Sequence, residues 1–284
     1  MVSGVLALDA VEHAFADGSI GLRGCSLSLE RGMRHALLGA NGAGKTTLLQ
    51  HLNGLLRPTS GTLRMDDQPF DYSRKGLAEL RRRVGLVFQN PDRQLFSAQV
   101  EEDVSFGPLN LGLDVATVRA RVASALAAVG LQDHGQRAVH HLSFGQKKRV
   151  CIAGVLAMEP EVLLLDEPMA GLDAPMQHEL ALLLDRLAAR GVTVLLSTHD
   201  VDFAYRWADR IHLMAEGGVI ASGPAQQVAR NDDALRAAGQ RPPAALALHA
   251  LLAARGVLPH AAAPRSIDAL LDALRTTQPE ESIT

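Results

Sequence analysis

The sequence predicts an α/β fold: a mostly parallel β-sheet covered by helices, with a small antiparallel β subdomain and a helical subdomain attached. Two short apolar runs, residues 162–165 and residues 192–196 with the single exception of Thr193, are typical of strands buried on both faces of a parallel sheet. Residues 185–190, which include Leu187, predict the helix that crosses between those strands. Alternating apolar and polar residues over positions 5–30, around a turn at Asp17 and Gly18, predict the antiparallel strands.

The other elements of the first half follow in chain order. Residues 35–38 are a short apolar run before a glycine, which predicts a buried strand. The next segment begins at Lys45 and has the spacing of a helix with one buried face, carried by Leu48, Leu49, Leu52, Leu55 and Leu56. Residues 57–61 predict a turn and residues 84–88 a strand. Three arginines, residues 81–83, are interpreted as the solvated last turn of a short helix.

The second half predicts mostly helices. Residues 101–158 are mainly helical, with interruptions expected at Gly107 and Pro108, Gly130, and Gly145. Residues 211–223 predict a hairpin around a Glu-Gly-Gly turn.

A break of Arg-Pro-Pro after Gly239 predicts a boundary between a main domain, residues 1–238, and a C-terminal helical extension, residues 239–284. The extension holds two short Ala/Leu-rich helices, the second with Ser266 as its N-cap. Dimerisation, regulation and simple packing are alternative roles for it.

Composition excludes several classes of protein. The chain has 284 residues and a net charge of −3, so it has no general attraction for nucleic acid, and we expect no nucleic-acid partner. Its two cysteines, Cys25 and Cys151, lie far apart and predict neither a disulfide framework nor a zinc site. We see no signal peptide and no apolar run long enough to span a bilayer. Work at a membrane would therefore require docking on another subunit.

A glycine-rich loop follows the strand at residues 35–38. It matches the complete phosphate-binding P-loop pattern and reads Gly39, Ala40, Asn41, Gly42, Ala43, Gly44, Lys45 and Thr46. Its glycines allow close backbone approach, so that successive N–H groups and the helix N-terminus form an anion site. We expect Lys45 to reach the β- and γ-phosphates of ATP, Thr46 to bind Mg²⁺ through its hydroxyl, and Thr47 to touch the α-phosphate.

Two acidic residues, Asp166 and Glu167, end the apolar strand at residues 162–165. They lie at the edge where open α/β sheets bind ligands. We expect Asp166 to hold Mg²⁺, directly or through water, and Glu167 to be the base that orients and polarises the attacking water. Because the transition state of phosphoryl transfer is loose, positioning and charge neutralisation supply most of the catalysis.

The segment at residues 142–149 reads Leu-Ser-Phe-Gly-Gln-Lys-Lys-Arg. Ser143 and Gln146 fit a capping box, and a capped helix start presents free N–H groups and a partial positive charge. After a complete P-loop, this segment resembles the signature motif of the ATP-binding cassette (ABC) ATPases. The resemblance implies that Ser143, Gly145 and Gln146 contact the γ-phosphate bound by the other subunit of a dimer. Phe144 replaces the family's usual glycine, and we expect it to point away from the phosphate and to pack on the helical subdomain.

Four further matches lie in the family's order. Gln89 resembles the Q-loop glutamine, which senses Mg²⁺ and the attacking water and couples to the membrane partner. Asp173 resembles the D-loop aspartate, which crosses the dimer interface. His199 resembles the switch histidine that contacts the γ-phosphate, and Phe15 the aromatic residue that stacks on adenine. The resemblance covers residues 5–228 and implies a P-loop NTPase of the ABC type, with a RecA-like core.

The class of ABC protein follows from what surrounds these motifs. The chain has no membrane span and no second cassette, and residues 89–142 leave no room for a long coiled coil. An importer ATPase on separate membrane subunits fits best. Residues 88–96 and 100–108 resemble the energy-coupling factor (ECF) ATPases, and most closely the cobalt-transport ATPases of that group.

The ECF resemblance implies partners and a location. Two identical chains, each with Mg-ATP, would dock on a transmembrane coupling subunit that works with a substrate-binding membrane subunit. The chain would then be peripheral, at the cytoplasmic face of the plasma (inner) membrane, with Asp92 and Gln94 as candidate contacts. Co²⁺ is the expected cargo, with nickel or a vitamin as the alternative. A soluble ABC ATPase acting on nucleic acid or ribosomes is the alternative from another class.

Overall fold

The computed structural model describes residues 4–259 and 263–277, and two β-sheets form within them. The larger sheet has the strand order β10-β9-β3-β8-β7-β6, and neighbouring strands are parallel except at the β9–β10 hairpin. Its strands are β3 (Arg34–Leu38), β6 (Val84–Val87), β7 (Val162–Leu165), β8 (Thr193–Thr198), β9 (Arg210–Ala215) and β10 (Gly218–Pro224). The predicted α/β class and the hairpin are confirmed.

The strands at the centre of this sheet are buried on both faces. Along β7, Leu163 and Leu165 belong to one hydrophobic core, whereas Val162 and Leu164 belong to the other. This alternation is the physical reason for an apolar run with no polar positions, because both faces exclude water.

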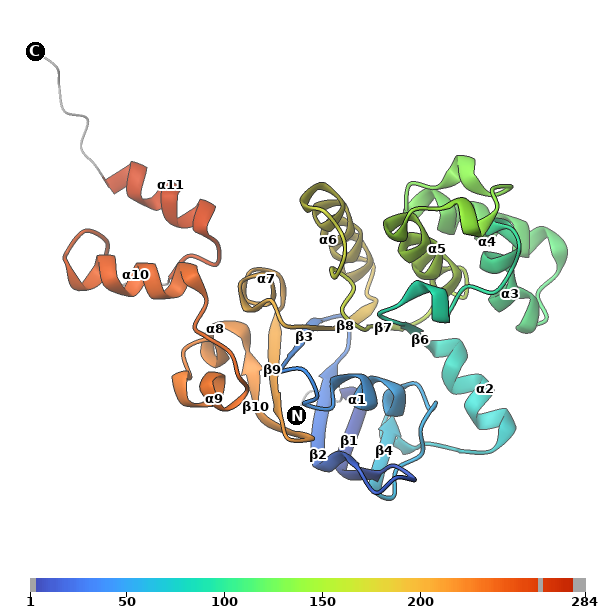
Figure 1. The fold of residues 1–284 in the computed structure, drawn as a ribbon, viewed down its shortest axis with the longest axis horizontal. Helices are drawn as coiled ribbons and strands as arrows, with labels where there is room; N and C mark the ends of the chain where they lie inside the picture. Colours follow the sequence, from blue (N-terminus) through green and yellow to red (C-terminus); the bar gives the residue numbers. More distant parts are fainter. Residues whose placement is uncertain (1–3, 260–262, 278–284) are drawn as a thin grey trace, which may run out of the picture.

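The smaller sheet is antiparallel, with the order β2-β1-β4-β5. It is formed by β1 (Gly4–Ala14), β2 (Ile20–Glu30), β4 (Ser60–Met65) and β5 (Gln68–Pro69). Helix α1 (Lys45–Leu52) packs between the two sheets (Figure 1), and its Leu48, Leu49 and Leu52 share a core with strands of both. The expected continuation of α1 to Leu55 and Leu56 is wrong, since the helix ends before Gly54 in a left-handed turn and Leu55 is exposed.

A helical group lies at one end of the larger sheet (Figure 1). It contains α3 (Val100–Asn110), α4 (Val115–Ala128) and α5 (Phe144–Leu156), and α2 (Arg74–Arg83) connects the smaller sheet to β6. Pro108 does not end α3: the helix lacks the hydrogen bond that an N–H at this position would make to Val104, but Pro108 is buried and α3 packs on α4 and α5. Gly145 lies inside α5, where an added Cβ would come within 2.6 Å of the Met176 sulfur. Only Gly130, in the left-handed region at φ 67°, follows a helix end, as predicted.

The remaining helices all follow β7 in the chain. They are α6 (Ala174–Ala189), α7 (Val201–Trp207), α8 (Ala225–Val228), α9 (Asp232–Ala237), α10 (Ala244–Ala254) and α11 (Ile267–Thr277). The α10 and α11 helices lie at the opposite end of the molecule from the helical group (Figure 1). Arg265 fastens them to α7 by donating to the Tyr205 carbonyl at 2.6 Å, and Ser266 caps α11 as expected. In the described part of the chain, no helix combines the length and apolarity that crossing a bilayer requires.

Candidate active site

The P-loop connects β3 to α1 and wraps one side of a cavity of about 750 Å³. Gly42 and Gly44 have φ angles of 81° and 102°, which side-chain-bearing residues rarely adopt. At Gly39 an added Cβ would lie 2.4 Å from the Met214 carbonyl oxygen, so this position also requires glycine. The loop is therefore shaped by local backbone geometry together with the close approach of β9.

Lys45 and Thr46 direct their polar atoms toward this cavity. The Lys45 ammonium is buried, donates to the carbonyl oxygens of Gly39 and Ala40 at 2.7 and 3.2 Å, and lies 3.9 Å from Oε1 of Glu167. Thr46 lines the cavity with its hydroxyl bonded to Asp166. The chain thus brings the P-loop cation and hydroxyl beside the acidic pair, about 120 positions away in the sequence.

The acidic pair is held by β7 and its neighbour β8. Ser197, fully buried at the end of β8, donates from Oγ to Oδ1 of Asp166 at 2.6 Å and accepts from the Glu167 N–H at 2.9 Å. This single hydroxyl positions both residues. Sequence reasoning assigned it no role, because only the pairing of β7 with β8 brings it beside them.

His199 extends the same group of residues. Its Nδ1 lies 3.1 Å from Oε2 of Glu167. Since an ionised carboxylate only accepts hydrogen bonds, the bond requires a proton on Nδ1. The exposed ring of His199 thereby orients the Glu167 carboxylate, and both side chains line the cavity, as does Gln89.

Phe15 lies at another part of the same cavity wall, beside Gly21 and Thr47. Its ring is 40% exposed and packs edge-on against His13 at 4.7 Å. His13 in turn packs on His51, whose Nδ1 lies 2.7 Å from the Thr47 carbonyl oxygen. Two histidines that the sequence did not single out therefore connect the aromatic face to the P-loop helix.

The residues expected to act on a second subunit do not line this cavity. Ser143 and Gln146 form the predicted capping box: the Gln146 N–H donates to Ser143 Oγ at 3.2 Å, and the Ser143 N–H donates to Gln146 Oε1 at 3.0 Å. Asp173 caps α6 by accepting from the Met176 N–H at 2.9 Å, and Gly145 is buried against Met176. Ser143 and Asp173 are exposed.

Phe144 packs in a different place from the one expected. Its ring lies against Gly171, where an added Cβ would be 2.8 Å from Phe144 Cε1, and faces the Lys148 ammonium at 5.4 Å. The expectation that it packs on the helical subdomain holds only for its contact with Lys148, because the ring also rests on Gly171 in the segment after β7. Burial lowers the pKa of Lys148 to about 8, although the charges of Glu167 and Asp166 oppose this shift.

Two further residues of the cavity wall come from the C-terminal part of the chain. Gly239 and Gln240 line it beside Ala40, whose N–H donates to the Ala238 carbonyl at 3.1 Å. The sequence marked Gly239 as a boundary, and its left-handed φ of 69° agrees with a helix end. Nothing in the local pattern indicated that this turn contacts the P-loop.

The donor set fits Mg²⁺. Thr46 Oγ1 and Asp166 Oδ2 lie 2.7 Å apart at the cavity wall, and both are the hard oxygen ligands that Mg²⁺ prefers. Within residues 4–259 and 263–277, no three His, Cys, Asp or Glu side chains are grouped as a metal cage. Mg²⁺ commonly binds through one or two protein oxygens together with phosphates and water, so this sparse set is the expected kind.

One cavity thus brings together a P-loop, an acidic pair and a histidine. This combination defines the class of an ATP-hydrolysing P-loop protein. A family described as "ABC transporter" matches residues 22–170. The chain belongs to this family of ATPases, whose hydrolysis of ATP is coupled to transport.

Two named proteins and one solved structure are similar to this chain over most of its length. The chain is 51% identical to the cobalt import ATP-binding protein CbiO of Rhodobacter capsulatus, over 94% of this chain and 95% of that protein. It is 45% identical to the energy-coupling factor transporter ATP-binding protein EcfA of Methanothermobacter thermautotrophicus, over 84% and 77% of the two chains. It also resembles the solved structure of cbiO1 from Clostridium perfringens, part of the transporter complex cbiONQ, with a TM-score of 0.74 and 44% identity, covering 82% of this chain and 94% of that one.

Proposed function

We propose that this chain is the ATP-hydrolysing subunit of an ECF-type importer for Co²⁺, working as a dimer on a transmembrane coupling subunit at the cytoplasmic face of the plasma membrane. The observation that carries the cobalt assignment is the similarity to the cobalt import ATP-binding protein, because it extends over nearly the whole chain, including most of the C-terminal extension. We treat residues 1–238 as the ATPase domain and residues 239–284 as that extension.

Dimerisation is supported by the position of the signature residues. The capped start of α5 presents N–H groups and the positive end of a helix dipole at an exposed site that does not belong to the chain's own ATP cavity. A second copy can place its γ-phosphate there. Each Ser143, Gly145 and Gln146 would then contact the ATP held by the partner's P-loop, with Asp173 beside the interface.

Hydrolysis in the closed dimer uses groups that the cavity already holds together. Lys45 and the P-loop N–H groups bind the phosphates, and Phe15 stacks on adenine. Bound Mg²⁺, held by Thr46, Asp166 and Gln89, would supply charge neutralisation at the β- and γ-phosphates. Glu167, oriented by His199, accepts the proton of a water whose oxygen attacks the γ-phosphorus as the bond to ADP breaks.

An apolar groove of about 590 Å³ supports docking on a membrane subunit. It lies between the larger sheet and the helical group, and Phe96 and Phe106 line it, 63% and 49% exposed, with their rings in edge contact at 4.7 Å. Exposed aromatic pairs of this kind are typical of interaction sites. Gln94 turns its amide inward, accepting from the Phe88 N–H and donating to the Cys151 carbonyl, so of the two proposed contacts Asp92 is the exposed one.

Docking is tested by replacing both Phe96 and Phe106 with serine. We expect the variant to bind ATP normally but to lose co-purification with its membrane subunits. Val115→Ser is the matched control, because Val115 is equally exposed and does not line the groove. Co-purification that survives the double replacement would place the docking site elsewhere.

The dimer is tested with Glu167→Gln, which keeps the shape of the side chain but cannot accept the proton. We expect it to bind ATP and to elute as a stable dimer in ATP and as a monomer without it. A monomeric elution profile in saturating ATP would count against the mechanism.

The cargo is tested in cells that lack this chain, by measuring uptake of Co²⁺, Ni²⁺ and a vitamin separately. We expect loss of Co²⁺ uptake, restored by the wild-type chain and not by Glu167→Gln. Loss of nickel or vitamin uptake alone would reassign the cargo. ATPase activity stimulated by DNA or ribosomes, with uptake intact, would favour a soluble ABC ATPase.

A further inference from the structure

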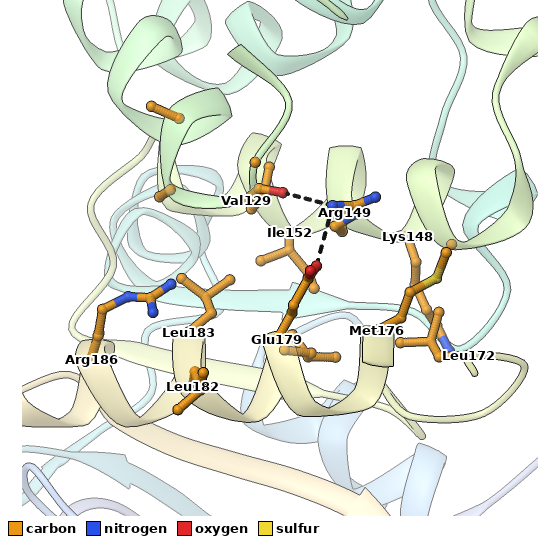
Figure 2. A pocket seen from close by; sticks show the side chains of 15 residues that line it. Val129, Lys148, Arg149, Ile152, Leu172, Met176, Glu179, Leu182, Leu183 and Arg186 are labelled. Carbon is orange, nitrogen blue, oxygen red and sulfur yellow. Dashed lines mark hydrogen bonds and ion pairs between the residues drawn. The ribbon is translucent and has the colours of Figure 1, made fainter. Parts of the chain in front are cut away.

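Lys148 is a buried cation that belongs to the signature helix and contacts the catalytic segment. Its side chain is 1% exposed, and its ammonium donates to the carbonyl oxygens of Glu167 and Ala170 at 3.0 and 2.7 Å. In Figure 2 the side chain leaves α5 and ends beside Leu172. A desolvated ammonium is costly unless its protons are paired, so this position is determined by the two carbonyl groups.

Glu167, whose carbonyl oxygen accepts a hydrogen bond from Lys148, has a strained backbone. Glu167 has a φ of 44°, in the left-handed region that residues with a side chain rarely adopt. Its carbonyl oxygen accepts from Lys148 and from the Ala170 N–H at 3.2 Å, and its own N–H is bonded to Ser197. These bonds hold the backbone in the conformation that directs the carboxylate toward His199.

Phe144 lies one helical turn before Lys148 and contacts the same segment of the chain. Residues four apart lie on the same helix face, and the Phe144 ring covers the Lys148 ammonium while resting on Gly171. The signature helix therefore contacts residues 167–171 through two neighbouring side chains, Phe144 and Lys148. The glycine that the family usually has at position 144 would leave the ammonium without this cover.

We propose that Lys148, covered by Phe144, is a positioning residue that sets the orientation of the Glu167 carboxylate for hydrolysis. The inference rests on the role proposed for Glu167 as the base. Under this proposal the signature helix α5 affects both ATP molecules of the dimer. The N-terminus of the helix contacts the ATP of the partner subunit, and its next turn, through Lys148, orients the base that acts on the chain's own ATP.

The test compares Lys148→Met with the wild-type protein in steady-state ATP hydrolysis. Methionine fills the same volume but donates no hydrogen bond. We expect kcat to fall about 10- to 100-fold, as for a misplaced catalytic group, with the KM for ATP changed less than about 2-fold. Lys148→Gln retains one donor group and should recover part of the rate. An unchanged kcat in folded Lys148→Met protein would overturn the inference.

A double-mutant cycle separates positioning from general structure. In the Glu167→Gln background, adding Lys148→Met should not lower the residual single-turnover rate further, since the lysine acts through that carboxylate. A full additional loss would mean that Lys148 acts independently of Glu167, which overturns the inference. Should Glu167→Gln itself hydrolyse ATP at the wild-type rate, the proposed base would be wrong, an outcome distinct from failure at Lys148.

Two further variants extend the test, one at the cover of Lys148 and one as a control elsewhere on α5 and α6. Phe144→Gly removes the cover and should lower kcat by about 2- to 5-fold, the scale of a cation–π contact. Arg149, the next residue of α5, bridges the Val129 carbonyl at 3.3 Å and Glu179 at 3.7 Å (Figure 2). Glu179→Gln breaks this link between α5 and α6 without touching Glu167, and kcat should stay within about 2-fold of wild type. An equal loss in Glu179→Gln would show that α5 docking as a whole, rather than Lys148, controls the rate.

Discussion

Ser197 shows how one hydroxyl group can organise a site. It is the shared partner of the Asp166 carboxylate and the Glu167 backbone, and it has no contact with solvent. A buried N–H left without a partner costs about 1–3 kcal/mol, so this position couples stability to the placement of both acidic residues.

Ser197→Ala should therefore lose about 1–3 kcal/mol of unfolding free energy and about 10-fold in kcat. Thr193→Val is the matched control, because Thr193 is buried in the same strand and accepts a hydrogen bond from the Gly32 N–H at 2.9 Å, away from the acidic pair. It should lose comparable stability with little change in kcat, measured by urea unfolding and phosphate release. Equal rate losses in both variants would contradict the argument.

Lys45→Ala removes the ammonium group that donates hydrogen bonds to two carbonyl groups of the P-loop. We expect ATP hydrolysis to fall at least about 100-fold, the scale of losing one preorganised charge, with weaker ATP binding. The fold should be unchanged, because the ammonium donates its hydrogen bonds to carbonyl groups of its own loop and lies 3.9 Å from one acidic side chain, Glu167. Nucleotide titration and thermal unfolding measure the two effects. Wild-type turnover in this variant would contradict the assignment of the loop.

At the scale of elements, an ion-pair network ties the smaller sheet to the larger one. Arg31 and Arg83 each bind both Asp66 and Glu161, at 2.5 to 2.9 Å. They join the turns after β2 and β4, the end of α2 and the start of β7. The three consecutive arginines were interpreted as a solvated helix turn. That is wrong for Arg83, which is 23% exposed and belongs to the network, whereas Arg82 remains at the surface.

The network predicts a pH dependence. Hydrogen bonds from Arg83, and then from Arg31, lower the pKa of Glu161 from 4.5 to about 2. Because the folded pKa is below the unfolded one, Glu161 stabilises the fold above about pH 4.5, and this contribution is lost as the pH falls toward 2. Glu161→Gln should cost about 1 kcal/mol at pH 7, since the side chains are partly exposed, and should flatten the decline between pH 4.5 and 2.

Urea unfolding across that pH range provides the measurement. Glu79→Gln is the control, because Glu79 pairs with Arg82 at the exposed surface of the same helix, α2, and should change stability by only a few tenths of a kcal/mol, about the value of such a helix pair. Parallel pH curves for the wild-type and Glu161→Gln proteins would contradict the role of the network.

At the scale of the whole molecule, Gly239 and Gln240, at the start of the proposed C-terminal extension, form part of the wall of the P-loop cavity. The turn at Gly239 rests on the P-loop, and an added Cβ there would lie 3.2 Å from the Ala40 side chain. The same segment leads directly into α10 and α11, which pack on α7 through Arg265. We therefore expect a change of the P-loop on binding ATP to shift the point where the proposed extension begins.

Gly239→Ala should weaken ATP binding by about 3- to 10-fold, because it combines a left-handed φ with a tight contact to the P-loop. Gly256→Ala is the matched control: it has a similar φ of 72°, but an added Cβ there would meet nothing within 4 Å. It should pay the same backbone cost without changing ATP affinity. Equal Kd values for ATP in the two variants would show that the turn does not act on the P-loop.

Much of the fold and site follows from local patterns. The P-loop, the strand that ends at Asp166, and the capping box of Ser143 and Gln146 each depend on residues a few positions apart, whose offsets determine a turn, a strand end or a helix start. The helix boundaries at Leu55 and Pro108 were predicted wrongly. Local propensities differ by about 1 kcal/mol for most residues and about 3 kcal/mol for proline, and tertiary packing can outweigh both.

The sequence by itself determined the class of fold, the glycine-rich P-loop, the acidic pair and the capped helix start at Ser143. Only the tertiary structure decided that Ser197 holds both acidic residues, that Lys148 and Phe144 reach the Glu167 segment, and that Gly239 rests on the P-loop. The physical reason is the separation along the sequence between the residues that interact. Backbone geometry is set by neighbours in the chain, whereas these contacts join strands and helices distant in sequence, and they form only when the cores on both sides of the sheet are packed.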